Sequence, residues 1–151
     1  MVSYATRQLV RQRSRFRCEY CHSPEFLSPD RFTIDHIQPR SRQGSDDVDN
    51  LALACHRCNE RRGNVTSTID PETQATVPFF NPRQQNWAEH FCWVEGGVRV
   101  LGLTAVGRGT CARLDCNDDR YPEADSIRAV RRLWINAGWH PPEDDPLEFR
   151  G

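Results

Sequence analysis

The sequence lacks the features that mark several large classes of protein. It contains no lysine, and all twenty of its basic residues are arginine, a bias that we attribute to GC-rich coding rather than to function. It has no apolar run near the roughly 18 residues of a membrane-spanning helix. Its first residues, Met1 to Tyr4, do not resemble a cleavable secretion signal. These absences lead us to expect a cytoplasmic protein without a membrane-spanning helix.

A strong net charge is also absent, since the formal net charge is only −1. Overall basicity therefore gives no sign of a nucleic-acid partner. The charges are nevertheless distributed unevenly: residues 1–17 contain five arginines and no acidic residue, whereas residues 143–145 are all acidic. Arginine forms bidentate contacts with phosphate groups, so the basic segment is a candidate phosphate-binding surface.

Length and composition indicate an ordinary globular protein. The 151 residues suit one compact domain with short extensions, and 37% hydrophobic with 27% charged residues is a usual balance for a soluble chain. The predicted parts are a basic N-terminal helix at 1–17, a core at 18–64, an extension packed on the core at 65–142, and an acidic tail at 143–151 that we expect to be frayed.

Local sequence patterns predict a β-loop-β-α unit in the core. The segment Phe32–Ile37 alternates in the manner of a strand. A polar loop follows, and the apolar residues 51–54 predict a second short strand. A helix is expected to begin near Cys55 or His56 and to end at Gly63.

The extension is predicted to hold a β-hairpin and two helices. Residues 64–86 contain three prolines and many polar residues, which predicts a loop that wraps around the core. The segments 87–94 and 98–103 flank a Gly-Gly turn and predict a hairpin. Thr104 is expected to cap a short helix, and an apolar stripe over 124–137 predicts the clearest helix of the chain.

The seven cysteines include two pairs with Cys-x-x-Cys spacing, Cys18 with Cys21 and Cys55 with Cys58. In a cytoplasmic protein, paired spacing favours metal binding over disulfides. Such a pair can bring two thiolates to one zinc ion at about 2.3 Å. Redox chemistry at one pair is the alternative, but two pairs without a thioredoxin-like βαβ pattern argue against it. We therefore predict a structural zinc that ties the N-terminal cysteine knuckle to the predicted helix.

The remaining cysteines and the neighbouring histidines have simpler interpretations. Cys92, Cys111 and Cys116 are expected to be buried as small apolar residues. His22 and His56 each adjoin a cysteine of the pairs and are alternative ligands. Four cysteines already complete a tetrahedral site, so we assign the zinc to them.

Between and behind the cysteine pairs lie residues that suit phosphodiester hydrolysis. His36 can take a proton from water near neutral pH, and Asp35 can hold a hard divalent cation. In a strand these two side chains point to opposite faces, so both serve one site only if the strand end bends. Asn59 and Arg62 share one face of the predicted helix, where they can present an oxygen ligand and a guanidinium to one phosphate.

This combination strongly resembles the HNH endonuclease family, in its zinc-stapled ββα-metal branch and its small stand-alone bacterial or phage type. The resemblance covers residues 15–64. It implies an α+β fold with a treble-clef-like, zinc-bound ββα core, a C-terminal β-hairpin and a helical extension. The motifs that carry it are Asp35-His36-Ile37, Asn50-Leu51, Cys55-x-x-Cys58-Asn59 and Arg62-Gly63, with Cys18-x-x-Cys21 upstream.

The resemblance implies metal-dependent hydrolysis of DNA phosphodiester bonds. His36 would be the general base, and Asp35 and Asn59 would hold one Mg²⁺ or Mn²⁺. Many family members have histidine where this chain has Asn59, a departure that favours Mg²⁺. Arg62 would neutralise charge on the phosphate, and Asn50 would brace the loop that orients the base. The expected contacts with the DNA backbone are Arg11, Arg13, Arg15 and Arg17.

A non-catalytic zinc module that binds nucleic acid or protein is the competing interpretation. It needs only the four cysteines and the arginines. It leaves Asp35, His36, Asn50 and Asn59 without a role. Within the nuclease class, restriction, homing of a mobile element and phage DNA processing are equally compatible with these residues.

Overall fold

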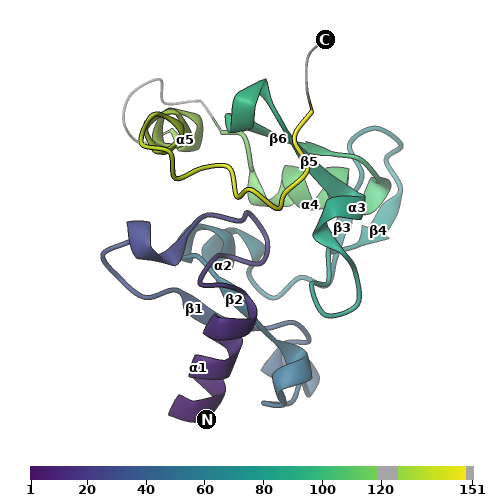
Figure 1. Ribbon diagram of the computed structural model, residues 1–151. Helices are drawn as coiled ribbons and strands as arrows, with labels where there is room; N and C mark the ends of the chain where they lie inside the picture. The colour runs from purple at the N-terminus through teal and green to yellow at the C-terminus, as the bar shows by residue number, and fades with distance from the viewer. Residues whose placement is uncertain (119–125, 149–151) are drawn as a thin grey trace. The chain divides into compact units, whose positions relative to one another are not determined.

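The computed structural model describes residues 1–118 and 126–148 (Figure 1). Its contacts divide the chain into two compact units rather than the one domain that the length suggests. The first unit comprises Met1–Thr66 and Phe80–Gln85, and the second comprises Ser67–Phe79 and Asn86–Gly151. In the part of the chain that is described, no helix has the length and apolar character needed to cross a membrane.

The first unit contains the predicted β-loop-β-α arrangement. Its two strands form an antiparallel pair in which Asp35 lies opposite Ala52 and His36 lies opposite Leu51. Short 3-10 turns occupy the connections, including the loop between the strands. The helices and strands in chain order are α1 (Tyr4–Arg13), β1 (Thr33–His36), β2 (Leu51–Ala54) and α2 (His56–Arg62).

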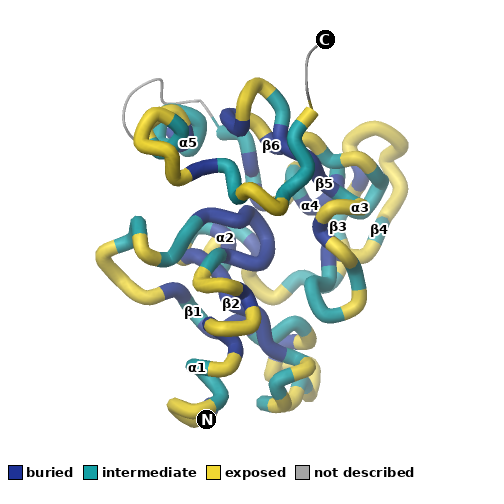
Figure 2. The backbone as a smooth tube through the Cα atoms, viewed as in Figure 1, coloured by how far each residue is buried: buried dark blue, intermediate teal, exposed yellow. Residues whose placement is uncertain are grey.

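The core of the first unit is built around β2. All four residues of this strand are buried, and the strand is dark along its length in Figure 2. The Glu19 carboxylate accepts a hydrogen bond from the Leu53 amide at 2.8 Å, and the Glu19 amide donates to the Leu53 carbonyl at the same distance. These bonds fix the first cysteine knuckle to the strand that leads into α2.

Both ends of α2 follow from local chemistry. The Cys55 sulfur accepts a hydrogen bond from the Cys58 amide at 3.3 Å and so caps the first turn. Gly63 ends the helix with φ of 59°, a conformation that glycine adopts without a steric penalty. The predicted helix boundaries are confirmed within one residue.

The second unit contains three elements that the sequence predicted and two that it did not. The hairpin, the helix capped by Thr104 and the last helix are present. The segment predicted as a wrapping loop instead contains a further hairpin, and residues 87–90 form one helical turn rather than strand. The elements are β3 (Ser67–Ile69), β4 (Thr76–Pro78), α3 (Trp87–His90), β5 (Phe91–Val94), β6 (Arg99–Gly102), α4 (Ala105–Leu114) and α5 (Ile127–Asn136). The predicted first residues of the last helix, 124 and 125, lie outside the described residues.

Residues 145–148 of the acidic tail are hydrogen-bonded to the rest of their unit, whereas fraying was expected there. The Trp93 amide donates to the Pro146 carbonyl, and the Glu148 amide donates to the Trp93 carbonyl. The Trp93 indole also donates to the Asp145 carboxylate at 2.9 Å. Trp93 is a fully buried residue of β5. A core residue of this unit therefore holds the tail beside β5.

Candidate active site and metal centre

The two cysteine pairs converge in the first unit. Their four sulfur atoms lie within 4.8 Å of one another and all four residues are buried. The ligands are Cys18, Cys21, Cys55 and Cys58. No other group of three or more histidine, cysteine or acidic residues in the described ranges is arranged to hold a metal. His22 and His56 are not part of the cluster, so the four cysteines alone make up the predicted ligand set.

The spacing of these sulfur atoms fits a tetrahedral zinc site. Zinc–sulfur bonds of about 2.3 Å place neighbouring sulfurs about 3.8 Å apart in a tetrahedron, and the Cys21 and Cys55 sulfurs are 3.7 Å apart. Burial raises the pKa of the Cys18 thiol, whereas hydrogen bonds from neighbouring thiols, that of Cys18 first, lower the pKa of Cys21. A bound cation would offset the charge of the thiolates that ligate it in this buried interior. The cluster could hold a zinc ion.

Asp35 lies inside the first unit on the side of β1 that faces Tyr20 and α2. It is 8% exposed. Its Oδ2 atom accepts a hydrogen bond from the Tyr20 hydroxyl at 2.7 Å and forms an ion pair with the Arg62 guanidinium. Among the described residues none donates to Oδ1. Burial, followed by the nearby Asp35 charge, raises the pKa of Tyr20, so its hydroxyl stays protonated and keeps donating.

Arg62 is an internal residue in this structure. It is 2% exposed, and its guanidinium also donates to the carbonyls of His36, Ile37 and Val65. Its expected position was one that faces the phosphate. The guanidinium instead has protein acceptors around it, and the strongest of them is the Asp35 carboxylate.

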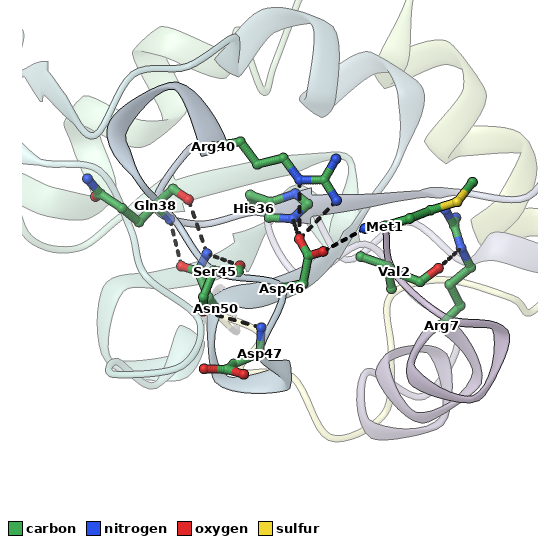
Figure 3. A network of polar contacts seen from close by, with 10 residues as sticks. All are labelled: Met1, Val2, Arg7, His36, Gln38, Arg40, Ser45, Asp46, Asp47 and Asn50. Atoms are coloured by element: carbon green, nitrogen blue, oxygen red, sulfur yellow. Dashed lines mark hydrogen bonds and ion pairs between the residues drawn. The ribbon is translucent and has the colours of Figure 1, made fainter.

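The side chain of His36 lies beside the loop between the two strands, whereas its carbonyl accepts from Arg62. Its Nε2 atom is 2.8 Å from Oδ1 of Asp46, and Figure 3 shows the two side chains facing each other. Arg40 donates to the same carboxylate oxygen from Nε at 3.2 Å and from Nη2 at 2.9 Å. The terminal amine of Met1 lies 3.0 Å from the other oxygen. These hydrogen bonds, that of His36 first, hold the pKa of Asp46 below its usual range.

Asn50 closes the same loop. Its Oδ1 accepts from the Gln38 amide at 2.8 Å, and its Nδ2 donates to the carbonyls of Gln38 at 3.1 Å and Ser45 at 2.8 Å (Figure 3). All three bonds go to backbone atoms of the segment that follows His36. This placement is that of a loop brace, the role expected for Asn50.

Asn59 lies on α2, one turn before Arg62 on the same helical face. Arg62 contacts Asp35, so this face of the helix is directed at the end of β1. Asn59 is partly exposed. An amide oxygen and a carboxylate oxygen are ligands that suit Mg²⁺.

The four arginines expected at DNA are placed differently from one another. Arg11 is buried, with its guanidinium 3.2 Å from the Glu25 carboxylate and 3.1 Å from the Phe32 carbonyl. Arg13 donates to the carbonyls of Val48 at 3.0 Å and Leu51 at 2.7 Å. Burial lowers the pKa of Arg13. These two side chains hold α1 against the strands. Arg15 is exposed and Arg17 is partly exposed.

Sequence reasoning missed three residues that contact the predicted site, namely Tyr20, Arg40 and Asp46. Tyr20 lies between the two cysteines of the first Cys-x-x-Cys pair, and the zinc motif by itself gives the residues between its ligands no role. The loop contains three acidic residues, at 46, 47 and 49. Only the folded loop distinguishes the one that reaches His36.

These observations define a ββα unit with a four-cysteine cluster and an Asp-His pair at the end of its first strand. Residues 18–65 match the model of the HNH endonuclease family, and the chain therefore contains an HNH endonuclease domain. A stretch of 59 residues is 44% identical to part of the CRISPR-associated endonuclease Cas9 of Corynebacterium diphtheriae, and covers 38% of this chain and 5% of that protein. The chain thus spans a small part of this relative. No solved structure matches it.

Proposed function

We propose that this chain is a metal-dependent DNA endonuclease whose active site is formed by Asp35, His36, Asn50 and Asn59. The observation that carries the proposal is the Asp-His pair at the end of β1 inside an HNH endonuclease domain. Asp35 keeps one carboxylate oxygen without a donor from the described residues, and His36 is oriented through Nε2 only. The first group is suited to hold a cation and the second to accept a proton.

The donor set fits a hard divalent cation. Asp35 Oδ1 and the Asn59 side-chain oxygen would hold one Mg²⁺ or Mn²⁺, which when bound polarises the phosphate and stabilises the leaving oxygen. Tyr20 and Arg62 keep Oδ2 in place, so the carboxylate cannot rotate freely. Both residues thus act on the metal site through Asp35.

His36 would act as the general base. Nε2 is occupied by Asp46, which leaves Nδ1 to take a proton from the attacking water. The water oxygen then bonds to phosphorus as the bond to the 3′-oxygen breaks, and that oxygen takes a proton from solvent. The products are a 5′-phosphate and a 3′-hydroxyl.

DNA would be held by arginines around this site through sequence-independent phosphate contacts. Arg13, Arg15 and Arg17 are the members of the N-terminal set that reach the surface. Arg11 would act indirectly, because it is buried and fixes α1 to the strands. Arg13 would also contribute by its bonds to the carbonyls of Val48 and Leu51. The four-cysteine cluster would hold a structural zinc that positions α2.

The test is plasmid nicking by the purified, zinc-loaded chain. Cleavage is expected with Mg²⁺ and none after exchange into buffer without Mg²⁺, with an unchanged circular dichroism spectrum in both. Such a result separates the catalytic cation from the structural one. DNA binding without any cleavage across Mg²⁺ and Mn²⁺ would instead support the non-catalytic zinc module.

Replacing Asn59 by alanine is expected to raise the Mg²⁺ concentration needed for half-maximal cleavage by roughly tenfold or more, because one oxygen ligand is lost while the base remains. A Mg²⁺ titration of the initial nicking rate measures the shift. Asn64→Ala is the matched control, since Asn64 is exposed just beyond α2. An unchanged titration for Asn59→Ala would remove this residue from the metal site.

Replacing Arg62 by alanine is expected to lower the free energy of unfolding by about 3–5 kcal/mol, because the buried Asp35 carboxylate loses its charged partner. Urea unfolding of the zinc-loaded protein measures the loss. Arg31→Ala, at an exposed arginine, should change stability by less than about 0.5 kcal/mol. If the two variants are equally stable, Arg62 is not the internal partner of Asp35.

A further inference from the structure

We propose that Asp46 is a positioning residue for the general base: it fixes the His36 ring through Nε2 and thereby directs Nδ1 at the attacking water. This inference deepens the proposed nuclease function and rests on it. Asp46 belongs to none of the motifs that indicate the HNH domain. It enters the site only through the fold of the loop between β1 and β2.

The contact itself determines which ring nitrogen carries the hydrogen. A carboxylate only accepts hydrogen bonds, so at 2.8 Å the Nε2 atom of His36 must donate to Asp46. In the neutral ring the hydrogen then sits on Nε2, and Nδ1 has the free electron pair that a base needs. Once Nδ1 takes a proton from water, the ring becomes positive, and the neighbouring carboxylate stabilises that charge.

Arg40 compensates the negative charge that Asp46 places beside the base. A lone carboxylate beside the base would repel a DNA phosphate and oppose binding. Two guanidinium nitrogens of Arg40 lie within 3.2 Å of the oxygen that faces His36. The Arg40 charge balances that of Asp46, while the geometry of the bond to His36 is kept.

The loop between β1 and β2 is closed so that the Asp46 carboxylate stays beside the His36 ring. Asn50 holds both the beginning of the loop at Gln38 and its middle at Ser45, the residue before Asp46. Gly44 approaches the Gln38 carbonyl so closely that a Cβ atom would lie 1.7 Å from its oxygen. The backbone is therefore tightly closed just before Asp46, and Figure 3 shows the bonds of Asn50 to Gln38 and Ser45.

Asp47 provides a matched control. It has the same charge, is the next residue along the loop, and is exposed. Its amide donates to the Ser45 hydroxyl, and in Figure 3 its carboxylate points away from His36. If the charge of the loop in general affected cleavage, replacing Asp46 and replacing Asp47 would lower the cleavage rate alike. Positioning of the base, by contrast, requires Asp46 alone.

The experiment combines single-turnover cleavage with nitrogen NMR of the full-length, zinc-loaded protein. For Asp46→Ala we expect the maximal cleavage rate to fall by about 10–100-fold with little change in the DNA concentration at half-maximal rate. Asp46→Asn should fall less, because its amide oxygen can still accept from Nε2. Asp47→Ala should match the wild type. In long-range ¹H–¹⁵N spectra, His36 of the wild type should show a protonated Nε2 and a bare Nδ1, and Asp46→Ala should lose this pattern.

The outcomes separate this inference from the proposed function. A wild-type chain that cuts DNA, with Asp46→Ala equal to Asp47→Ala in rate, would overturn the role of Asp46 and leave the nuclease intact. An Asp46→Ala spectrum that keeps the wild-type His36 pattern would also overturn it. A wild type that fails to cut DNA under any divalent cation would overturn the nuclease function itself. The NMR signals are assigned to His36 by their loss in His36→Ala.

Discussion

Replacing His36 by alanine is expected to reduce the rate of DNA cleavage by roughly 10²–10⁴-fold, the contribution of a positioned general base. Affinity for DNA should stay the same, because phosphate contacts come from other residues. The side chain is 16% exposed, and among the described residues its hydrogen-bond partner is Asp46, so its removal should leave the core of the unit unchanged. Single-turnover nicking measures the rate, and a gel-shift titration without Mg²⁺ measures the affinity.

The control for this variant is His56→Ala, which removes an exposed histidine of the same unit. It should cut DNA at nearly the wild-type rate. Thermal unfolding and zinc content should be alike in both variants. Cleavage by His36→Ala at the wild-type rate would contradict the assignment of the base, and the non-catalytic zinc module would then be the better interpretation.

The core of the first unit was predictable because its determinants are local. The alternation around Asp35, the apolar strand at 51–54 and the glycine after α2 each specify their own element. The cysteine pairs then specify which elements meet, since four thiolates at this spacing can share one ion. The placement of Asn50 was also visible, because it lies where the polar loop returns to the second strand, and its side chain bonds to the backbone of that loop.

The partners of Asp35 and His36 were not predictable for a physical reason. A helical-face argument places Arg62 beside Asn59, but it does not show whether the side chain points outward to a phosphate or inward to a carboxylate. That choice depends on Tyr20, which lies 42 residues away in sequence and shares the same pocket of polar atoms. The selection of Asp46 from the acidic loop residues likewise depends on loop closure.

The second unit was less predictable because its pairings are between distant segments. The hairpin of β3 and β4 consists of exposed and half-buried residues, so it lacks the apolar alternation by which a strand is predicted. Packing supports it instead: a Cβ atom on Gly109 of α4 would approach the Thr68 methyl group to 2.8 Å. The pairing of the tail with Trp93 joins residues more than fifty positions apart, and local composition carries no sign of it.

Replacing Cys55 by serine is expected to remove the bound zinc and to unfold the first unit. Zinc binding to such sites contributes about 10–16 kcal/mol in peptides at neutral pH, which exceeds the stability of a typical small domain. Serine is a favourable N-cap residue, so the hydroxyl can keep the capping role that the Cys55 sulfur has at the start of α2. The loss therefore reports the metal rather than the cap. Metal analysis and circular dichroism of the purified variant measure both effects.

The matched control is Cys111→Ser, a substitution outside the cluster at a cysteine that is only partly buried. It should keep about one zinc per chain and the wild-type melting curve. Because α2 carries both Asn59 and Arg62, Cys55→Ser should also abolish cleavage, and added Mg²⁺ should not restore it. Asn59→Ala, by contrast, should recover activity at high Mg²⁺. Native spectra and cleavage in a zinc-free Cys55→Ser protein would show that the cysteine cluster does not organise the active site.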